Sequence, residues 1–132
     1  MVLSWRQLAS LLGPPGPMAP QLIWLANPQA AERRILLRAP QPLSLQRIEA
    51  VLTGGTSPSV SLTLRHGADV STAGTAVSSS PLTISSANGG TTTGAVFSSF
   101  QNPAMPMDHW LWLEITAVSG SPTGLAVSLR FS

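Results

Sequence analysis

The sequence of 132 residues has the length of one domain with a single modest core. Only 9% of the residues are charged, the formal net charge is +2, all seven basic residues are arginine, and cysteine is absent. This composition excludes disulfides and thiolate metal sites, and it offers no dense basic stripe to a nucleic-acid backbone, so we expect no nucleic-acid partner.

The first twelve residues carry the signals of a short amphipathic helix. Ser4 and Gln7 have the spacing of a capping box, and a Gly-Pro pair at 13–14 ends the segment. Four apolar residues fall on one face: Trp5, Leu8, Ala9 and Leu12. A helix over about residues 5–12 is too short to persist alone in water. We therefore expect it to dock, either on its own domain or on a neighbouring subunit.

The same twelve residues do not predict a membrane segment. They are too few to cross a bilayer, and Arg6 and Gln7 interrupt the apolar run. A signal peptide would have a basic head followed by an unbroken apolar stretch. We expect neither membrane association nor export by the secretory route.

Residues 13–20, GPPGPMAP, predict an extended tether. Polyproline-type backbone has no internal hydrogen bonds and spans about 3 Å per residue, so it can carry the helix about 20 Å from its root. The apolar segment 21–26, QLIWLA, follows it and is either a strand added to a partner's sheet or the first strand of this domain. We treat residues 1–32 as an N-terminal arm whose predicted partner-binding residues are Trp5, Leu8, Leu12, Pro14, Pro15, Pro17 and Trp24.

Residues 33–132 form the body, in which the apolar period changes to two. Alternation is clear over residues 48–52, 60–64 and 125–131, as is typical of half-buried antiparallel strands. Gly-, Pro- and Asn-containing turn signals recur at roughly ten-residue spacing. The sequence therefore predicts an all-β fold, an antiparallel β-sandwich of about 7–8 strands of the jelly-roll or Ig-like type.

Residues 70–93 are rich in Ser, Thr and Gly, with apolar residues only at Val77, Leu82 and Ile84. Two interpretations stay open for this stretch. It forms either short edge strands joined by a long loop, or a flexible low-complexity loop.

The segment from 109 to 117 has apolar residues on both faces. Its core face comprises Leu111, Leu113, Ile115 and Ala117. Trp110 and Trp112 occupy the opposite face, where polar residues are usual. Either the arm or a crossing loop covers these indoles, or they form a subunit interface, or they stack on a sugar ring.

Candidate catalytic groups are few. His66 with Asp69, or His109 beside Asp108, has the residue types of a nucleophilic triad, but no Gly-x-Ser-x-Gly elbow accompanies them. The remaining acids are scattered, and no His or Cys pairs have metal-ligand spacing. We expect no catalytic, cofactor-binding or metal-binding residues, and hence no enzyme.

Two stretches resemble a known type of module. They are IEAVLTGGTSPSVSLTLRHGADVSTAGTAV, residues 48–77, and AMPMDHWLWLEITAVSGSPTGLAVSLRF, residues 104–131. Both are similar to a small β-sandwich module of tailed-phage virion proteins. The resemblance does not extend to residues 1–32. It implies a virion component: a capsid decoration or cement protein, a head-fibre base, or a tail-fibre or baseplate element.

A compact body with a stiff, helix-bearing arm favours the first of these. We expect a cement protein that clamps neighbouring capsid subunits through its arm, located in the virion and assembled in the host cytoplasm. Its partners would be the major capsid protein or another virion protein, and copies of itself, preferably as a trimer. The alternative is a head-fibre, tail-fibre or baseplate adhesion module that binds a host-surface glycan or another virion protein.

Overall fold

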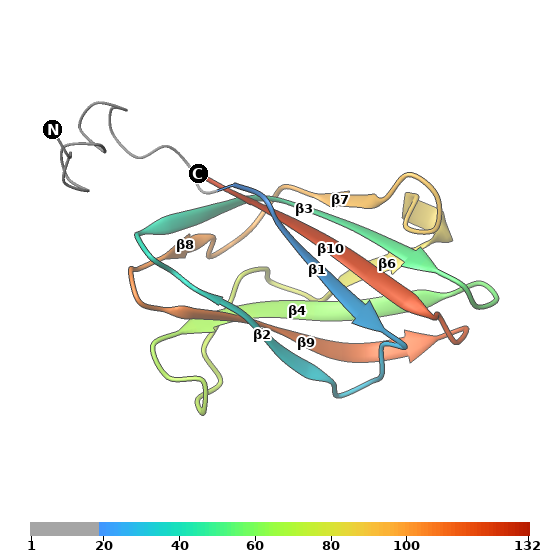
Figure 1. Ribbon diagram of the computed structural model, residues 1–132, viewed down its shortest axis with the longest axis horizontal. Helices are drawn as coiled ribbons and strands as arrows, with labels where there is room; N and C mark the ends of the chain where they lie inside the picture. Colours follow the sequence, from blue (N-terminus) through green and yellow to red (C-terminus); the bar gives the residue numbers. More distant parts are fainter. Residues whose placement is uncertain (1–18) are drawn as a thin grey trace, which may run out of the picture.

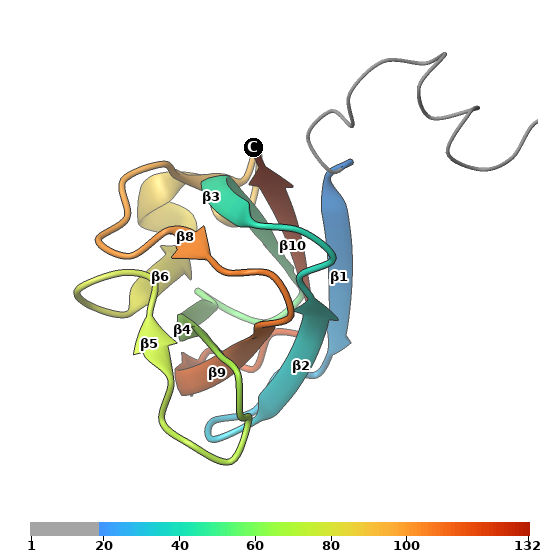
Figure 2. The same ribbon diagram turned by 90° about the vertical axis from the view of Figure 1, so that its left-hand side faces the viewer.

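The computed structural model describes residues 19–132. Ten strands in this range form two antiparallel sheets that pack face to face (Figures 1 and 2). Strands hold 54% of the described residues and helix 3%, which confirms the predicted all-β sandwich. Eight of the ten strands have three residues or more, and the other two have two residues each.

The first sheet has the spatial order β1 (Gln21–Ala26), β10 (Gly124–Phe131), β3 (Leu43–Thr53) and β7 (Ala95–Phe97), with β8 (Ala104–Met105) also paired to β3. The second sheet has the order β2 (Arg33–Arg38), β9 (Trp110–Ser119), β4 (Ser59–Gly67) and β5 (Thr75–Ala76), with β6 (Leu82–Ser85) also paired to β4. One 3-10 turn, η1 (Ser86–Asn88), follows β6.

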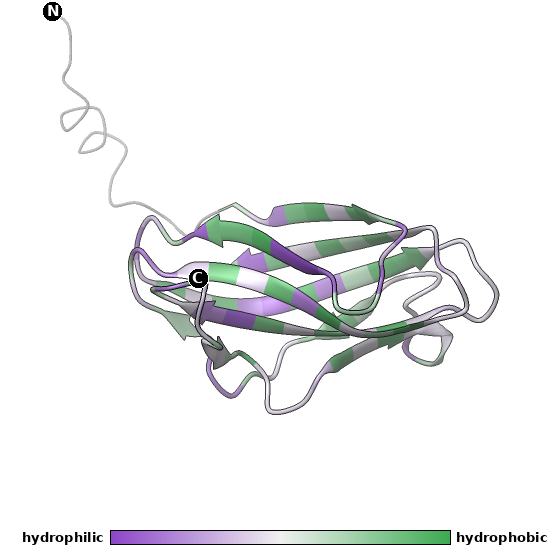
Figure 3. Cartoon of the chain, turned by 90° about the horizontal axis from the view of Figure 1, so that it is seen from below, coloured by the Kyte–Doolittle hydropathy of each residue, from purple (hydrophilic) through white to green (hydrophobic). Residues whose placement is uncertain are grey.

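The core lies between the sheets and follows the predicted alternation, which Figure 3 shows as bands of green and purple along the strands. In β3, β4 and β10 every predicted inward residue is buried: Ile48, Ala50 and Leu52 of β3, Val60, Leu62 and Leu64 of β4, and Leu125, Val127, Leu129 and Phe131 of β10. Each large aliphatic side chain buried in this way contributes about 1.5–3 kcal/mol to stability.

Strand β9 departs from simple alternation. Ala117, predicted on the core face, is exposed, whereas Val118 packs against the core. The reason is a register shift against β4: Leu62 pairs with Ile115 and Ser61 with Ala117, which leaves Thr116 as an extra residue. Such a bulge inverts the faces of the residues that follow it.

The segment 21–26 is the domain's own first strand. It forms β1 and pairs with β10 of the same chain, from Gln21 with Leu129 to Ala26 with Gly124. Leu25 is fully buried in the sandwich core, which explains why the strand docks here. The body therefore includes residues 21–32, which the sequence had assigned to the arm.

The Ser/Thr/Gly-rich middle is tied to the sandwich at several points. It forms β5, β6 and η1, as expected from the edge-strand interpretation. Val77 and Ile84 are buried in the core, and the Val77 carbonyl accepts hydrogen bonds from the Gln101 and Asn102 N–H groups.

Candidate interaction surface

The outer face of the first sheet carries a shallow depression, which we call the β10 groove. Alternate residues of β10 point into the core, so those between them point outward, and all of these near the groove are small. The groove consists of seven residues: Gly124, Ala126 and Ser128 on the floor, Leu22 and Trp24 on the β1 side, and Val51 and Val96 on the β3 and β7 side.

Strand register brings these residues together. Trp24 pairs with Ala126, and Ala126 pairs with Val51, so one row crosses three strands. In the next row Leu22 pairs with Ser128. Between the walls lies a depression of about 160 Å³, lined in part by Leu22, Val51, Ala126 and Ser128. The arrangement is an open, mostly apolar trough along β10.

Gly124 allows the indole of Trp24 to lie close to the sheet. A β-carbon built at position 124 would collide with Cη2 and Cζ2 of Trp24, so only glycine leaves room for the ring there. The ring is thereby laid across the end of the groove floor.

The groove exposes large apolar side chains to water. Leu22 is 74% exposed, Trp24 53% and Val96 50%. Single exposed apolar residues are common on protein surfaces, but several on one face of a sheet are typical of an interaction site. The exposed fractions already include the cover that the rest of residues 19–132 provides.

Charges on this face are few, but one of them, Glu49, lines the depression, since it pairs with Ser128 on one side and with Val96 on the other. The Nε atom of Arg47 is 2.7 Å from a carboxylate oxygen of Glu49, and Arg130 pairs with Arg47 across the strands. The Glu49 charge is therefore already compensated by its neighbour. The groove suits an apolar partner better than a charged one.

Trp112, on the opposite sheet, is fully buried although it points away from the sandwich core. The guanidinium carbon of Arg33 lies 4.8 Å from its ring centre, and Gly67 and Gly74 pass beside the ring. Its Nε1–H donates to Oε1 of Glu114 at 3.1 Å. A crossing loop therefore covers Trp112, which was one of the alternatives that the sequence left open for this residue.

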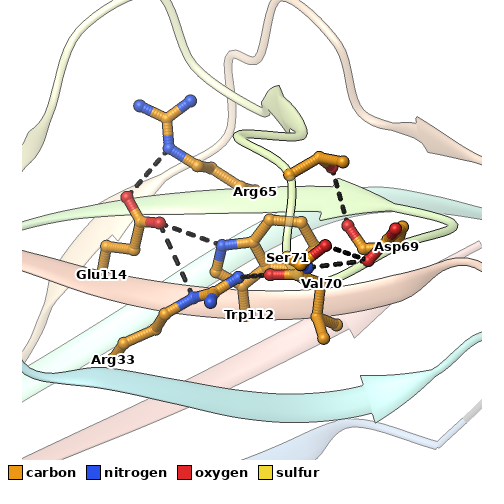
Figure 4. Close-up of polar contacts among 8 residues, drawn as sticks. Arg33, Arg65, Asp69, Val70, Ser71, Trp112 and Glu114 are labelled. Atoms are coloured by element: carbon orange, nitrogen blue, oxygen red, sulfur yellow. Dashed lines mark hydrogen bonds and ion pairs between the residues drawn. The ribbon is translucent and has the colours of Figure 1, made fainter.

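The covering loop, residues 68–74, is held by polar contacts (Figure 4). Arg33 donates to the carbonyl of Val70, and Oδ1 of Asp69 accepts from the N–H of Ser71 at 2.9 Å and from its hydroxyl at 2.7 Å. These two bonds lower the pKa of Asp69 below its ordinary value. Trp112 therefore offers no surface to a partner while this loop is in place.

Glu114 links the strands beneath the same loop. Its Oε2 accepts from Nε of Arg65 at 3.0 Å, and its Oε1 lies 3.8 Å from Nε of Arg33. The three side chains are about one-third exposed, so the ion pairs are screened by water and are worth little individually. Their main effect is to fix the position of the Trp112 ring.

Trp110 is only half-buried. The guanidinium of Arg38 lies 5.4 Å from its ring centre, at cation–π distance. A subunit interface at Trp110 therefore stays a prediction, but a paired platform formed with Trp112 is not available in this arrangement.

The two histidines approach each other at one end of the sandwich, with ring centres 5.8 Å apart. Nε2 of His66 lies 3.3 Å from the backbone oxygen of Asn102, and both Nδ1 atoms are buried without a hydrogen-bond partner in the described part of the chain. Burial lowers the pKa of His66 below 6.5, and the nearby His109 lowers it further, although the Asn102 bond acts in the opposite direction.

The carboxylates that sequence placed beside the histidines have other partners. Asp69 bonds to Ser71, and Asp108 lies 3.8 Å from Arg38. Within residues 19–132, no three His, Asp or Glu side chains gather as a metal site. That part of the chain also contains no helix long and apolar enough to cross a membrane.

Of the predicted partner-binding residues, Trp24 is described and lies in the groove wall. The others, Trp5, Leu8, Leu12, Pro14, Pro15 and Pro17, lie outside the described residues. Sequence reasoning missed Leu22, Val51, Val96 and Ala126. The sequence did contain a signal for Leu22. Residues 21–26 have apolar side chains on both faces of a strand, which predicts an apolar residue on the outer face as well.

Comparison with protein families, with characterised proteins and with solved structures gave no match to this chain.

Proposed function

We propose that this protein is a structural component of a tailed-phage virion, a capsid decoration or cement protein whose N-terminal arm clamps neighbouring subunits of the shell. The observation that carries the proposal is the exposed apolar groove beside β1, the strand that directly follows the arm's proline-rich tether. Trp24 in its wall is 53% exposed. Apolar surface at the root of an arm with its own apolar stripe suits a protein that works by burying area against other polypeptides.

The resemblance of residues 48–77 and 104–131 to tailed-phage sandwich modules supplies the context. The proposed partners are the major capsid protein or another virion protein, together with further copies of this chain, preferably in a trimer. The proposed location is the virion, after assembly in the host cytoplasm. No turnover of a substrate is part of this role, and no cofactor is required for it.

Cosedimentation tests the proposal. Full-length protein and a variant lacking residues 1–20 are mixed with capsid shells assembled from the major capsid protein whose gene lies nearest to this one. We expect the full chain to sediment with the shells and the truncated chain to stay in the supernatant. Ala117→Asp, at an exposed position of the second sheet, serves as a control that should bind normally. Absence of full-length protein from the pellet would contradict the cement role.

The alternative is an adhesion module of a head fibre, tail fibre or baseplate that binds a host-surface glycan or another virion protein. One observation favours it: the exposed indole of Trp24 has the flat apolar surface on which a sugar ring stacks. An adhesion module would bind host cells without residues 1–20 and lose binding on Trp24→Ala. Retention of cell binding by the truncated chain would therefore favour this role over the cement role.

A further inference from the structure

We propose that the β10 groove of one copy receives the apolar stripe of residues 5–12 from a second copy of the same chain. This inference rests on the proposed structural role and names the partner of the arm. It joins a groove whose apolar walls are exposed among residues 19–132 and a short segment whose four stripe residues, according to the sequence, need burial.

The groove can receive the side chains of a helix that lies over it. Its walls stand on β1 and β3, the two neighbours of β10, whose backbones are about 10 Å apart at two strand spacings. An α-helix with its side chains is about 10–12 Å across, so it would lie above the walls and project side chains between them. The small floor residues Ala126 and Ser128 leave room for those side chains.

The groove also has the length of the stripe. From the Ser128 row to the Gly124 row, where the Trp24 ring covers the floor, the sheet extends four residues, or about 13 Å. The stripe from Trp5 to Leu12 would extend seven residues along a helix, or about 10 Å. Its two leucines and Trp5 could then contact Leu22, Trp24 and Val51 together.

The point where the arm joins the body favours a second copy over the arm's own groove. Residue 20 precedes Gln21, which begins β1, the wall of the groove itself. The tether of residues 13–20 contains four prolines and would span about 20 Å in the polyproline conformation expected for it. That is longer than the groove, so an extended tether would place the stripe beyond its own groove and within reach of a neighbour's.

Such a contact is heterologous, because a segment of one copy meets a different surface of the next. Heterologous contacts close into rings when the rotation between copies permits. A ring of three satisfies every arm and every groove, in agreement with the trimer expected for this protein.

Subunit mixing tests the inference with the full-length chain. Ala126→Arg fills the groove floor with a side chain that points outward, and Leu8→Asp places a charge in the stripe. We expect the wild type to be oligomeric by light scattering and each variant alone to be monomeric, with at least a tenfold rise in the dissociation constant. Mixed in equal amounts, the variants should form a 1:1 heterodimer, since one retains an intact arm and the other an intact groove.

Two further variants keep the test decisive. Ala117→Arg makes the same change at an exposed alanine of the second sheet and should leave the oligomer intact. Leu22→Asp alters a side chain that is 74% exposed and replaces Ala126→Arg if circular dichroism finds that variant unfolded.

Other occupants of the groove give different outcomes, each of which overturns the inference. Variants that stay monomeric when mixed indicate that each arm docks on its own body. An oligomer lost in Ala126→Arg but kept in Leu8→Asp indicates face-to-face pairing of sheets. A monomeric wild type indicates that no second copy occupies the groove. If the protein is monomeric and still binds shells, this inference fails and the cement role stands. If the protein forms arm-linked oligomers that do not bind shells, the cement role fails and this inference stands.

Discussion

At the scale of single residues, Gly74 shows how closely the covering loop fits over Trp112. Its φ is +66°, and a β-carbon there would lie 2.6 Å from Cη2 of Trp112. Left-handed backbone costs a non-glycine residue about 1–2 kcal/mol, and the overlap with the ring adds to this cost. The loop can therefore follow this path over the indole only with glycine at position 74.

Gly74→Ala should consequently lower the free energy of unfolding by more than Gly89→Ala. Gly89 has a similar φ of +81°, but its nearest neighbour to an added β-carbon is the Thr93 hydroxyl at 3.1 Å, which can rotate away. We expect a loss of about 1–2 kcal/mol at Gly89 and a larger loss at Gly74. Urea unfolding followed by tryptophan fluorescence measures both. Equal losses would mean that the ring does not constrain the loop.

His66 gives the protein a pH dependence. Its pKa is lowered in the folded state by burial and by His109, so the folded protein binds this proton less readily than the unfolded chain does. The free energy of unfolding carries no penalty from His66 above pH 6.5, and it falls as the pH drops below that value. We expect the urea midpoint to decrease between pH 7.5 and 5, and His66→Gln to reduce that decrease. Asp69 does not interfere, because its lowered pKa places its own titration below pH 3.8. A pH profile unchanged by the substitution would contradict this assignment.

At the scale of elements, the bulge in β9 reverses which residue faces the core. Val118→Asp should destabilise the fold by about 2 kcal/mol or more, since it places a carboxylate against apolar neighbours. Ala117→Asp, one residue earlier and exposed, should change stability by less than about 0.5 kcal/mol. Unbroken alternation would predict the opposite order, so thermal unfolding of the pair distinguishes the two registers.

The same strand marks how far sequence could predict this fold. Strict alternation over residues 48–52, 60–64 and 125–131 identified the inward faces correctly, because the extra residues at their register shifts, Thr116 of β9 and Gln46 of β3, lie on the partner strands. The bulge at Thr116 left no sign in the sequence, since it arises from pairing with β4. The cover over Trp112 was equally hidden, because it depends on the three-dimensional path of residues 68–74.

The candidate site was predictable only in part. Trp24 was identified from an apolar run, but its neighbours Val51, Val96 and Ala126 are distant in sequence and meet it only through strand order. Val51 alternates with core residues, so the sequence pattern indicated only that it faces outward and not that it belongs to a site. The helix, tether and trimer expected for the arm stay predictions, because they concern residues 1–18 and partner chains.

At the scale of the whole molecule, the low charge content indicates how the proposed assembly should respond to salt. Glu49 is the one charged residue that lines the depression, and it is paired with Arg47. We expect the dissociation constant of the arm-linked oligomer to change by less than about threefold between 50 and 500 mM NaCl, since only exposed charges are screened over that range. Sedimentation equilibrium at several salt concentrations measures this. Dissociation at high salt would point to an ionic contact in place of the apolar groove.

The sandwich also has a polarity from end to end. Gln21 pairs with Leu129, so the root of the arm and the carboxyl end of β10 share one end (Figure 1). At the other end three turns are bonded to one another, through Asn27 to Thr123 and Thr56 to Gly120. If the arm faces a shell, an affinity tag placed after Ser132 would be hidden against that shell. A reporter epitope inserted in the 54–57 turn would instead point outward, which makes this turn the practical position for display or labelling.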